Sequence, residues 1–114
     1  MLKVGLAGYG FMGHMHADCW KATGLAQIAA VAAIGDTRAA EVRDTLNVNT
    51  YPTVEAMLDA EQLDVVDVCL PTFLHAEATI AALTAGVHVL CEKPMARTVD
   101  ECLRMEQAAA DAKG

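Results

Sequence analysis

The sequence predicts an α/β fold in which helices cover both faces of one parallel β-sheet. Short apolar runs alternate along the chain with segments of helical period, and turn residues stand at most of the junctions. The run at residues 28–34 is apolar at every position rather than at alternate ones, which is typical of a strand covered on both faces. With 114 residues, of which 54% are hydrophobic, the chain is expected to form one domain with one core.

Strands and helices are expected to alternate from the first residues to the last. The third strand has the weakest pattern. The strands are expected at residues 2–7, 28–34, 49–51, 65–70 and 87–91, and the helices at residues 11–23, 38–46, 54–59, 75–85 and 99–112. In the last helix an apolar stripe interrupted only by Glu106 is expected to dock on the sheet, and it consists of Val99, Cys102, Leu103, Ala109 and Ala110.

Charge and hydropathy exclude two classes of partner. Eight Lys and Arg against fifteen Asp and Glu give a formal net charge of −7, so the domain repels polyanions and nucleic acid is not an expected partner. No stretch approaches the roughly 18 to 20 apolar residues of a membrane span, and the N-terminus runs straight into patterned sequence without a charged leader. The four cysteines form no CxxC pair. Buried free thiols and a cytoplasmic location are therefore expected, with a metal or disulfide role as the alternative.

A glycine-rich turn, Gly8-Tyr9-Gly10-Phe11-Met12-Gly13, follows the first strand and opens the first helix. In a dinucleotide-binding GxGxxG turn, the first glycine permits the tight turn and the second lets the backbone approach a pyrophosphate, while the third lets the helix pack close to the strand. The helix N-terminus then offers N–H donors to the phosphates. The side chains expected to line the groove are Tyr9, Phe11 and Met12, with a core position as the alternative for Met12.

Asp36, at the end of the second expected strand, strengthens this interpretation. It lies 23 residues after Gly13, close to the ~20 expected of a carboxylate that holds a ribose 2′-hydroxyl. Such a carboxylate repels the 2′-phosphate of NADP, so NAD is the expected cofactor. Arg38 leaves NADP as the less favoured alternative, because an arginine there can bind a 2′-phosphate or lie on the adenine. The structural alternative is a plain glycine turn with a helix-capping Asp36.

Two segments of the chain resemble a known family. They read VGLAGYGFMGHMHADCW from Val4 and DVVDVCLPTFLHAEATIAALTAGVHVLCEKPMARTVD from Asp64. Together they resemble the N-terminal domain of the glucose-fructose oxidoreductase and inositol dehydrogenase family, the Gfo/Idh/MocA oxidoreductases. The resemblance covers essentially the whole chain and implies a Rossmann fold, a doubly wound parallel sheet with strand order 3-2-1-4-5, over residues 1–114. It also implies a larger second domain that supplies most of the substrate pocket.

The resemblance further implies roles for residues after the fourth and fifth strands. Lys93 is expected beside the nicotinamide ribose and the reacting hydroxyl of the substrate, where it orients the alcohol and eases loss of its proton. Glu92 is expected to contact the ribose or nicotinamide, and Pro94 to hold the direction of Lys93. The turn expected along the ribose and pyrophosphate contains Pro71, Thr72 and His75. Each of three residues has a structural alternative: Lys93 as a surface lysine, Glu92 as a carboxylate that leads a helix, and His75 as a histidine that braces its helix.

These expectations combine into one predicted function. The chain is expected to be the NAD(H)-binding part of an oxidoreductase that interconverts an alcohol and a ketone by hydride transfer. The alcohol belongs to a sugar, cyclitol or related polyol, and the chain alone is expected to be inactive. A stand-alone dinucleotide-binding or sensing module is the alternative, whereas the Glu92-Lys93-Pro94 tripeptide disfavours enzymes of the dihydrodipicolinate-reductase or homoserine-dehydrogenase type.

Two further expectations concern metals and assembly. His14 and His16 are two residues apart on a helix and point to different sides, so no metal site is predicted. The fifth strand is expected to leave an unpaired apolar edge, and the protein is therefore expected to form a homo-oligomer.

Overall fold

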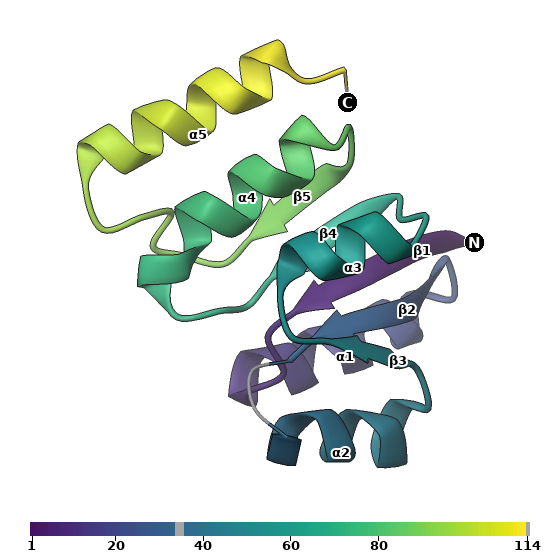
Figure 1. Ribbon diagram of the computed structural model, residues 1–114. Helices are drawn as coiled ribbons and strands as arrows, with labels where there is room; N and C mark the ends of the chain where they lie inside the picture. The colour runs from purple at the N-terminus through teal and green to yellow at the C-terminus, as the bar shows by residue number, and fades with distance from the viewer. Residues whose placement is uncertain (34–35, 114) are drawn as a thin grey trace.

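Five parallel strands form one sheet: β1 (Leu2–Ala7), β2 (Ala26–Ala32), β3 (Asn49–Tyr51), β4 (Val65–Val68) and β5 (His88–Cys91). The helices are α1 (Phe11–Thr23), α2 (Asp36–Leu46), α3 (Val54–Ala60), α4 (His75–Thr84) and α5 (Val99–Asp111), with a short 3₁₀ turn η1 (Thr72–Leu74). The strand order β3-β2-β1-β4-β5 confirms the expected topology (Figure 1). This computed structural model describes residues 1–33 and 36–113, and side chains at residues 1–33 and 38–113.

Helices cover both faces of the sheet, as expected, and each face has its own core. On one face α1 and α2 pack against β1 and β2 around the fully buried Leu6, Val31 and Val42. On the other face α3 and α4 pack around Met57 and Val66, which are also fully buried. Full burial of an aliphatic side chain contributes about 1.5–3 kcal/mol to stability. The central strands are therefore the rigid platform from which the loops at their carboxyl ends project.

The bounds of three strands differ from the prediction. β5 begins at His88 rather than at residue 87, and β2 and β4 differ by more. β2 starts at Ala26 rather than at residue 28, because Leu2 at the start of β1 pairs with Ala26 and draws the preceding residues into the sheet. The last residue predicted for this strand, Ile34, lies outside the described residues. β4 ends at Val68 rather than at residue 70, since the chain turns at Leu70, whose carbonyl oxygen accepts a hydrogen bond from a side chain of α4.

The last helix packs on α4 rather than on the sheet, so the predicted docking of its apolar stripe is wrong (Figure 1). Its buried residues are Glu101 and Met105, whereas Val99 and Leu103 from the predicted stripe are 76% and 56% exposed. One oxygen of the buried Glu101 carboxylate pairs with Arg97, with 2.9 Å between Nη2 and Oε1, whereas Oε2 has no hydrogen-bond partner among the described residues. A paired carboxylate can occupy a buried position, and the apolar pattern alone therefore selected the wrong face.

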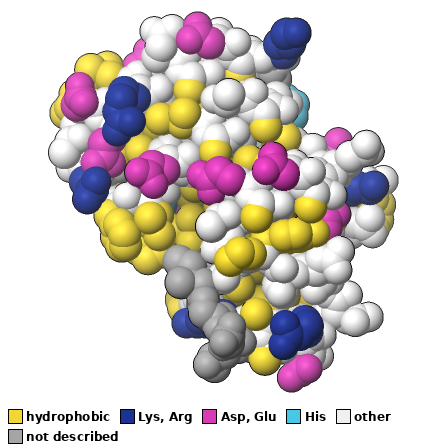
Figure 2. Space-filling model, viewed as in Figure 1, with side chains coloured by type: hydrophobic (Ala, Val, Ile, Leu, Met, Phe, Trp, Pro, Cys, Tyr) yellow, Lys and Arg dark blue, Asp and Glu magenta, His cyan; other side chains and the backbone are white. Residues whose placement is uncertain are grey.

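The cysteines and the surface charge can also be compared with what the sequence predicts. All four cysteines are free thiols, as predicted, but their expected burial is wrong, because Cys19 is exposed and the other three are only half-buried. Asp and Glu side chains are spread over the face shown in Figure 2, in agreement with the net charge of −7. Within the described residues, no helix combines the length and apolarity that crossing a membrane requires.

Candidate functional site

A groove of about 440 Å³ lies at the carboxyl edge of the sheet, where open α/β sheets bind their ligands. It is lined by residues 8–12 of the glycine turn, by Arg38 of α2, and by Cys69, Leu70 and Pro71 after β4. A second hollow of about 220 Å³ lies between the end of β2 and the first turns of α3 and α4, and is also lined by Leu70. The two hollows are therefore neighbours and meet at Leu70.

The three glycines of the turn occupy different environments. Gly8 has a φ of 93°, and a Cβ there would lie 2.8 Å from the carbonyl oxygen of Cys69. A Cβ on Gly13 would clash with the carbonyl oxygen of Gly8, so this glycine lets α1 pack against its own turn. A Cβ on Gly10 would meet only Nη2 of Arg38, at 3.9 Å. Gly8 and Gly13 are thus needed by the fold, whereas the space in front of Gly10 is open.

The Arg38 guanidinium lies next to the glycine turn, in front of Gly10. Its Nη1 donates a hydrogen bond to the carbonyl oxygen of Tyr9 at 2.6 Å and lies 3.7 Å from Oε2 of Glu41. Glu41 in turn contacts Nε2 of His14 at 2.7 Å, and the His14 ring stacks on Tyr9 with 3.8 Å between ring centroids. Burial, followed by the negative charges of Glu41 and Asp18, raises the pKa of Tyr9. The Asp36 side chain, predicted to bind the ribose, lies outside the described residues.

The predicted residues after β4 separate into two groups. Pro71 lines the groove and Thr72 is half-buried in η1. His75 is 1% exposed and lies behind the groove wall, where Nε2 donates to the carbonyl oxygen of Leu70 at 2.7 Å and Nδ1 contacts that of Pro94 at 2.9 Å. His75 therefore links the loop after β4 to the loop after β5 through its two ring nitrogens.

Glu92 and Lys93 do not line the same groove as the glycine turn. They line a separate hollow of about 540 Å³ between β5, α4 and α5. The Lys93 side chain is exposed, and the backbone N–H of Glu92 donates to the carbonyl oxygen of Val68 at 3.0 Å, which continues the pairing of β5 with β4. Of the predicted residues, the structure thus gathers the following in the groove: Gly8, Tyr9, Gly10, Phe11, Met12, Arg38 and Pro71.

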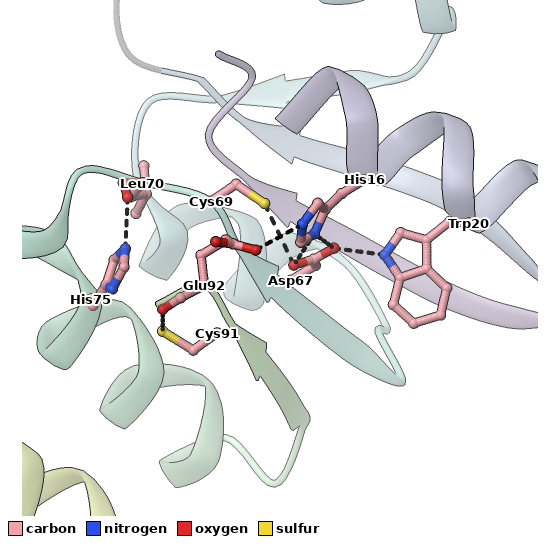
Figure 3. A network of polar contacts seen from close by, with 8 residues as sticks. All are labelled: His16, Trp20, Asp67, Cys69, Leu70, His75, Cys91 and Glu92. Carbon is pink, nitrogen blue, oxygen red and sulfur yellow. Dashed lines mark hydrogen bonds and ion pairs between the residues drawn. The ribbon is translucent and has the colours of Figure 1, made fainter. Parts of the chain in front are cut away.

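A polar network beneath the sheet edge was not predicted from the sequence (Figure 3). Its centre is Asp67 on β4, which is 0% exposed. Trp20 Nε1 donates to Asp67 Oδ2 at 2.7 Å, His16 Nδ1 lies 2.8 Å from the same oxygen, and the Cys69 thiol donates to Oδ1 at 3.5 Å. On its other side, His16 Nε2 lies 3.1 Å from Oε1 of Glu92. The network therefore joins α1, β4 and the end of β5.

The network changes the acidity of its members. Burial alone lowers the pKa of His16, but the hydrogen bonds and charges of Asp67 and then Glu92 outweigh it, so this pKa is raised. Burial raises the pKa of the Cys69 thiol, and the neighbouring Asp67 carboxylate adds to the effect. Cys69 is therefore a neutral thiol donor, and His16 has the character of an imidazolium between two carboxylates.

Three side chains of this network are of kinds that also bind metal ions. Ligand atoms of His16, Asp67 and Cys69 lie within 4.8 Å of one another. His16 and Cys69 both use these atoms to contact the Asp67 carboxylate, so the potential ligand atoms are already engaged in contacts among the three side chains. His14 points away toward Glu41, which agrees with the expectation that the two histidines face different sides.

One feature of the sequence could have identified this network. Asp67 is the only charged residue in the apolar run 65–70, and a carboxylate in a buried strand needs donors from the elements packed on it. His16 and Trp20 lie one turn apart on α1, the helix that follows β1. Once β1 and β4 are adjacent, these two side chains are placed to supply the donors.

Comparison with known proteins gives relatives along nearly the whole chain. It is 37% identical to levoglucosan dehydrogenase of Pseudarthrobacter phenanthrenivorans, over 96% of this chain and 30% of the relative. It is 40% identical to an NADP(+)-dependent D-xylose 1-dehydrogenase of Haloferax volcanii, over 75% of this chain and 27% of the relative. A structure of levoglucosan dehydrogenase in complex with NADH and levoglucosan superposes with a TM-score of 0.87 and 36% identity, over 97% of this chain and 32% of that one.

The chain thus spans about a third of the length of the relatives that it matches. A family model described as "Oxidoreductase family, NAD-binding Rossmann fold" matches residues 2–114. That range contains the glycine turn, the groove and the segment that carries Lys93. The chain belongs to the Gfo/Idh/MocA family of oxidoreductases and carries its NAD-binding Rossmann fold.

Proposed function

We propose that this chain binds NAD(H) in the groove at the sheet edge and is the dinucleotide-binding domain of an oxidoreductase. The observation that carries the proposal is the open space in front of Gly10, at the N-terminus of a 13-residue helix without a side-chain cap. The first N–H groups of a helix have no helical partners and carry partial positive charge, which suits a pyrophosphate. The adjoining hollow between the end of β2 and the first turn of α4 suits the adenosine half.

NAD rather than NADP is the proposed cofactor. The sequence position of Asp36 favours a free ribose 2′-hydroxyl. In addition, the Arg38 guanidinium already contacts the carbonyl oxygen of Tyr9 and the carboxylate of Glu41, so part of its positive charge is neutralised. The similar levoglucosan dehydrogenase structure contains NADH, although the similar xylose dehydrogenase is named for NADP(+).

The proposed reaction interconverts an alcohol and a ketone on a sugar, cyclitol or related polyol. When bound, the nicotinamide supplies the acceptor or donor of hydride. Lys93 is proposed to orient the substrate alcohol through its exposed ammonium group and to ease loss of the hydroxyl proton. The names of the similar dehydrogenases, for levoglucosan and D-xylose, support this substrate class. We further propose that a second domain completes the substrate pocket, because their chains are about three times as long.

A stand-alone dinucleotide-binding module is the second candidate. It is favoured by the separation of the glycine-turn groove from the hollow that Lys93 lines. Oxidation of polyols with NAD by the full chain, as its gene encodes it, distinguishes the two candidates. Turnover well above background supports the oxidoreductase, and tight NADH binding without turnover of any polyol supports the module.

The variant Gly10→Val tests the proposed groove. The φ of −84° at Gly10 is accessible to other residues, and a Cβ there finds no close neighbour, so the variant is expected to fold. Its side chain fills the space proposed for the pyrophosphate, and NADH affinity should fall at least about a hundredfold, or about 2.7 kcal/mol. Fluorescence titration with NADH measures this loss. The control is Ala22→Val at the exposed far end of α1, which should bind like the wild type. Undiminished NADH affinity in folded Gly10→Val would show that the turn is only structural.

A further inference from the structure

Lys93 lies between two residues that are held by histidines from different helices. The carboxylate of Glu92 lies 3.1 Å from Nε2 of His16 on α1, and the carbonyl oxygen of Pro94 lies 2.9 Å from Nδ1 of His75 on α4. Lys93 itself is exposed. The segment is therefore fixed on both sides of the lysine, while the lysine side chain is open to solvent.

The other side of His16 is anchored in the middle of the sheet. Its Nδ1 lies 2.8 Å from Asp67, which is fully buried and pairs in register with Leu6 of β1 and Leu90 of β5. The indole of Trp20 donates to the same carboxylate at 2.7 Å. A buried carboxylate is destabilised when any of its donors moves away, so Asp67 gives His16 a fixed position. Nε2 of His16 is consequently a fixed donor at the end of β5.

The arrangement requires both ring nitrogens of His16 to carry protons. Each nitrogen faces a carboxylate, Asp67 on one side and Glu92 on the other, and carboxylates only accept hydrogen bonds. An imidazolium is the only form of histidine that donates from both nitrogens. It also gives Glu92 a partner other than the adjacent Lys93 ammonium. Without this partner the carboxylate is free to pair with Lys93 and withdraw it from a substrate.

We propose that His16 is a positioning residue for Lys93: fixed through Asp67, it holds the Glu92 carboxylate on the α1 side and so sets the direction of the lysine. The catalytic consequence rests on the proposed function. The positional consequence does not, because the surroundings of Lys93 can be measured without turnover. His16 itself lines neither the groove nor the hollow lined by Lys93, and it reaches that hollow through its contact with Glu92, which is one of the lining residues.

The test uses the full chain as its gene encodes it, with His16→Gln, Glu92→Gln and the double variant. The matched control is His88→Gln, which removes an exposed histidine of β5. We expect the side-chain NMR signals of Lys93 to move in His16→Gln and to stay in place in His88→Gln. We expect kcat to fall about tenfold or more in both single variants, and the NADH affinity of His16→Gln to change less than about twofold, because misplacing a reacting group affects turnover more than binding.

The double variant decides whether His16 acts through Glu92. If it does, kcat of the double variant is no lower than that of Glu92→Gln alone, since the two residues form one pathway. Losses that multiply in the double variant overturn the proposal, as do unchanged Lys93 signals in His16→Gln. His16→Gln could fail to fold because the Asp67 charge is left unpaired. In that case the double variant His16→Gln/Asp67→Asn, which lacks this charge, is measured instead of His16→Gln.

Two more outcomes separate this inference from its alternatives. Stoichiometric zinc in the purified protein, lost on Cys69→Ser, would overturn the proposal, because a metal rather than Glu92 would then fix His16. Absence of NADH binding by the wild type would overturn the proposed function, and the Lys93 signals in His16→Gln would still decide the positional claim by themselves.

Discussion

Arg38 is the side chain whose contacts bear most directly on the choice between NAD and NADP. Its guanidinium lies over the glycine turn and is held by the carbonyl oxygen of Tyr9 and by Glu41. Glu41 is itself fixed by His14 at 2.7 Å. A guanidinium held in this way is less available to a 2′-phosphate, since it must leave a carboxylate to reach the phosphate.

Glu41→Gln should therefore shift the preference toward NADPH. A half-exposed ion pair of this kind is worth about 0.2–1 kcal/mol, so the ratio of the NADPH and NADH dissociation constants should fall by up to about fivefold. Parallel fluorescence titrations with the two cofactors measure the ratio. Asp44→Asn, an exposed position on the same helix, removes one negative charge without touching Arg38 and should leave the ratio unchanged. If Glu41→Gln and Asp44→Asn had the same ratio of NADPH and NADH dissociation constants, Glu41 would not be what limits the binding of a 2′-phosphate by Arg38.

His16 should also make stability depend on pH. Burial lowers the folded pKa of His16, but the hydrogen bonds and charges of Asp67 and Glu92 outweigh this effect and raise the pKa above its usual value. A raised folded pKa contributes stability that is fully present below the unfolded pKa and is lost as the pH rises through the folded pKa. In Glu92→Gln the pKa of His16 is raised less, so less stability should be lost as the pH rises from below the unfolded pKa of His16 to above its folded pKa. Urea denaturation across this range measures the difference, and a gap between the two proteins that widens with pH would contradict the assignment.

At the scale of elements, the angle between β1 and α1 is set by the glycine turn. A Cβ on Gly13 would clash with the backbone carbonyl of Gly8, which cannot move without opening the turn. At the opposite end of the same helix, Gly24 is the C-cap with a φ of 67°, and a Cβ there meets nothing within 4 Å. Substitution of Gly13 therefore tests the effect of a steric clash on stability, and substitution of Gly24 tests the effect of a left-handed backbone.

Gly13→Ala and Gly24→Ala form a matched pair of substitutions. Gly24→Ala should lose about 1–2 kcal/mol of unfolding free energy through backbone strain and keep its NADH affinity. Gly13→Ala should lose more stability and also NADH affinity, because α1 must shift away from β1. Urea denaturation and NADH titration of both variants measure the two effects. A Gly13→Ala protein as stable as Gly24→Ala would show that the turn accommodates the methyl group.

The elements that the sequence predicts best are those whose signals are local. β1 and α1 have the predicted bounds, because an apolar run, a glycine turn and a helix C-cap glycine lie next to one another in the chain. β3 also has the predicted bounds, although its pattern is weak. The packing of α5 was not predictable in this way, since Glu101 becomes buried only through its pair with Arg97. The network of His16, Asp67 and Glu92 joins residues 51 and 76 positions apart. Only the strand order brings them together, and that order came from the family resemblance.

For the molecule as a whole, part of the exposed apolar surface lies at the β5 end of the sheet. Leu90 on β5 and Met95 after it are 46% and 45% exposed, and Val99 and Leu103 on the neighbouring α5 are 76% and 56% exposed. β5 is the last strand of the sheet and pairs with β4 alone among the described strands. The N–H groups of His88 and Glu92 donate to the β4 side, so those of the intervening Val89 and Cys91 point outward.

This edge should make the 114-residue chain self-associate, most simply as a two-fold dimer in which the β5 strands pair and the sheets join. Light scattering coupled to gel filtration over a range of concentrations measures the mass. Val89→Pro removes an outward N–H without removing a donor to β4 and should weaken the dimer, whereas Leu103→Lys should weaken it only if the exposed face of α5 forms the contact. A monomer at high micromolar concentration would contradict the prediction, because an unpaired apolar edge with neither a proline nor a lysine in β5 has little to prevent pairing.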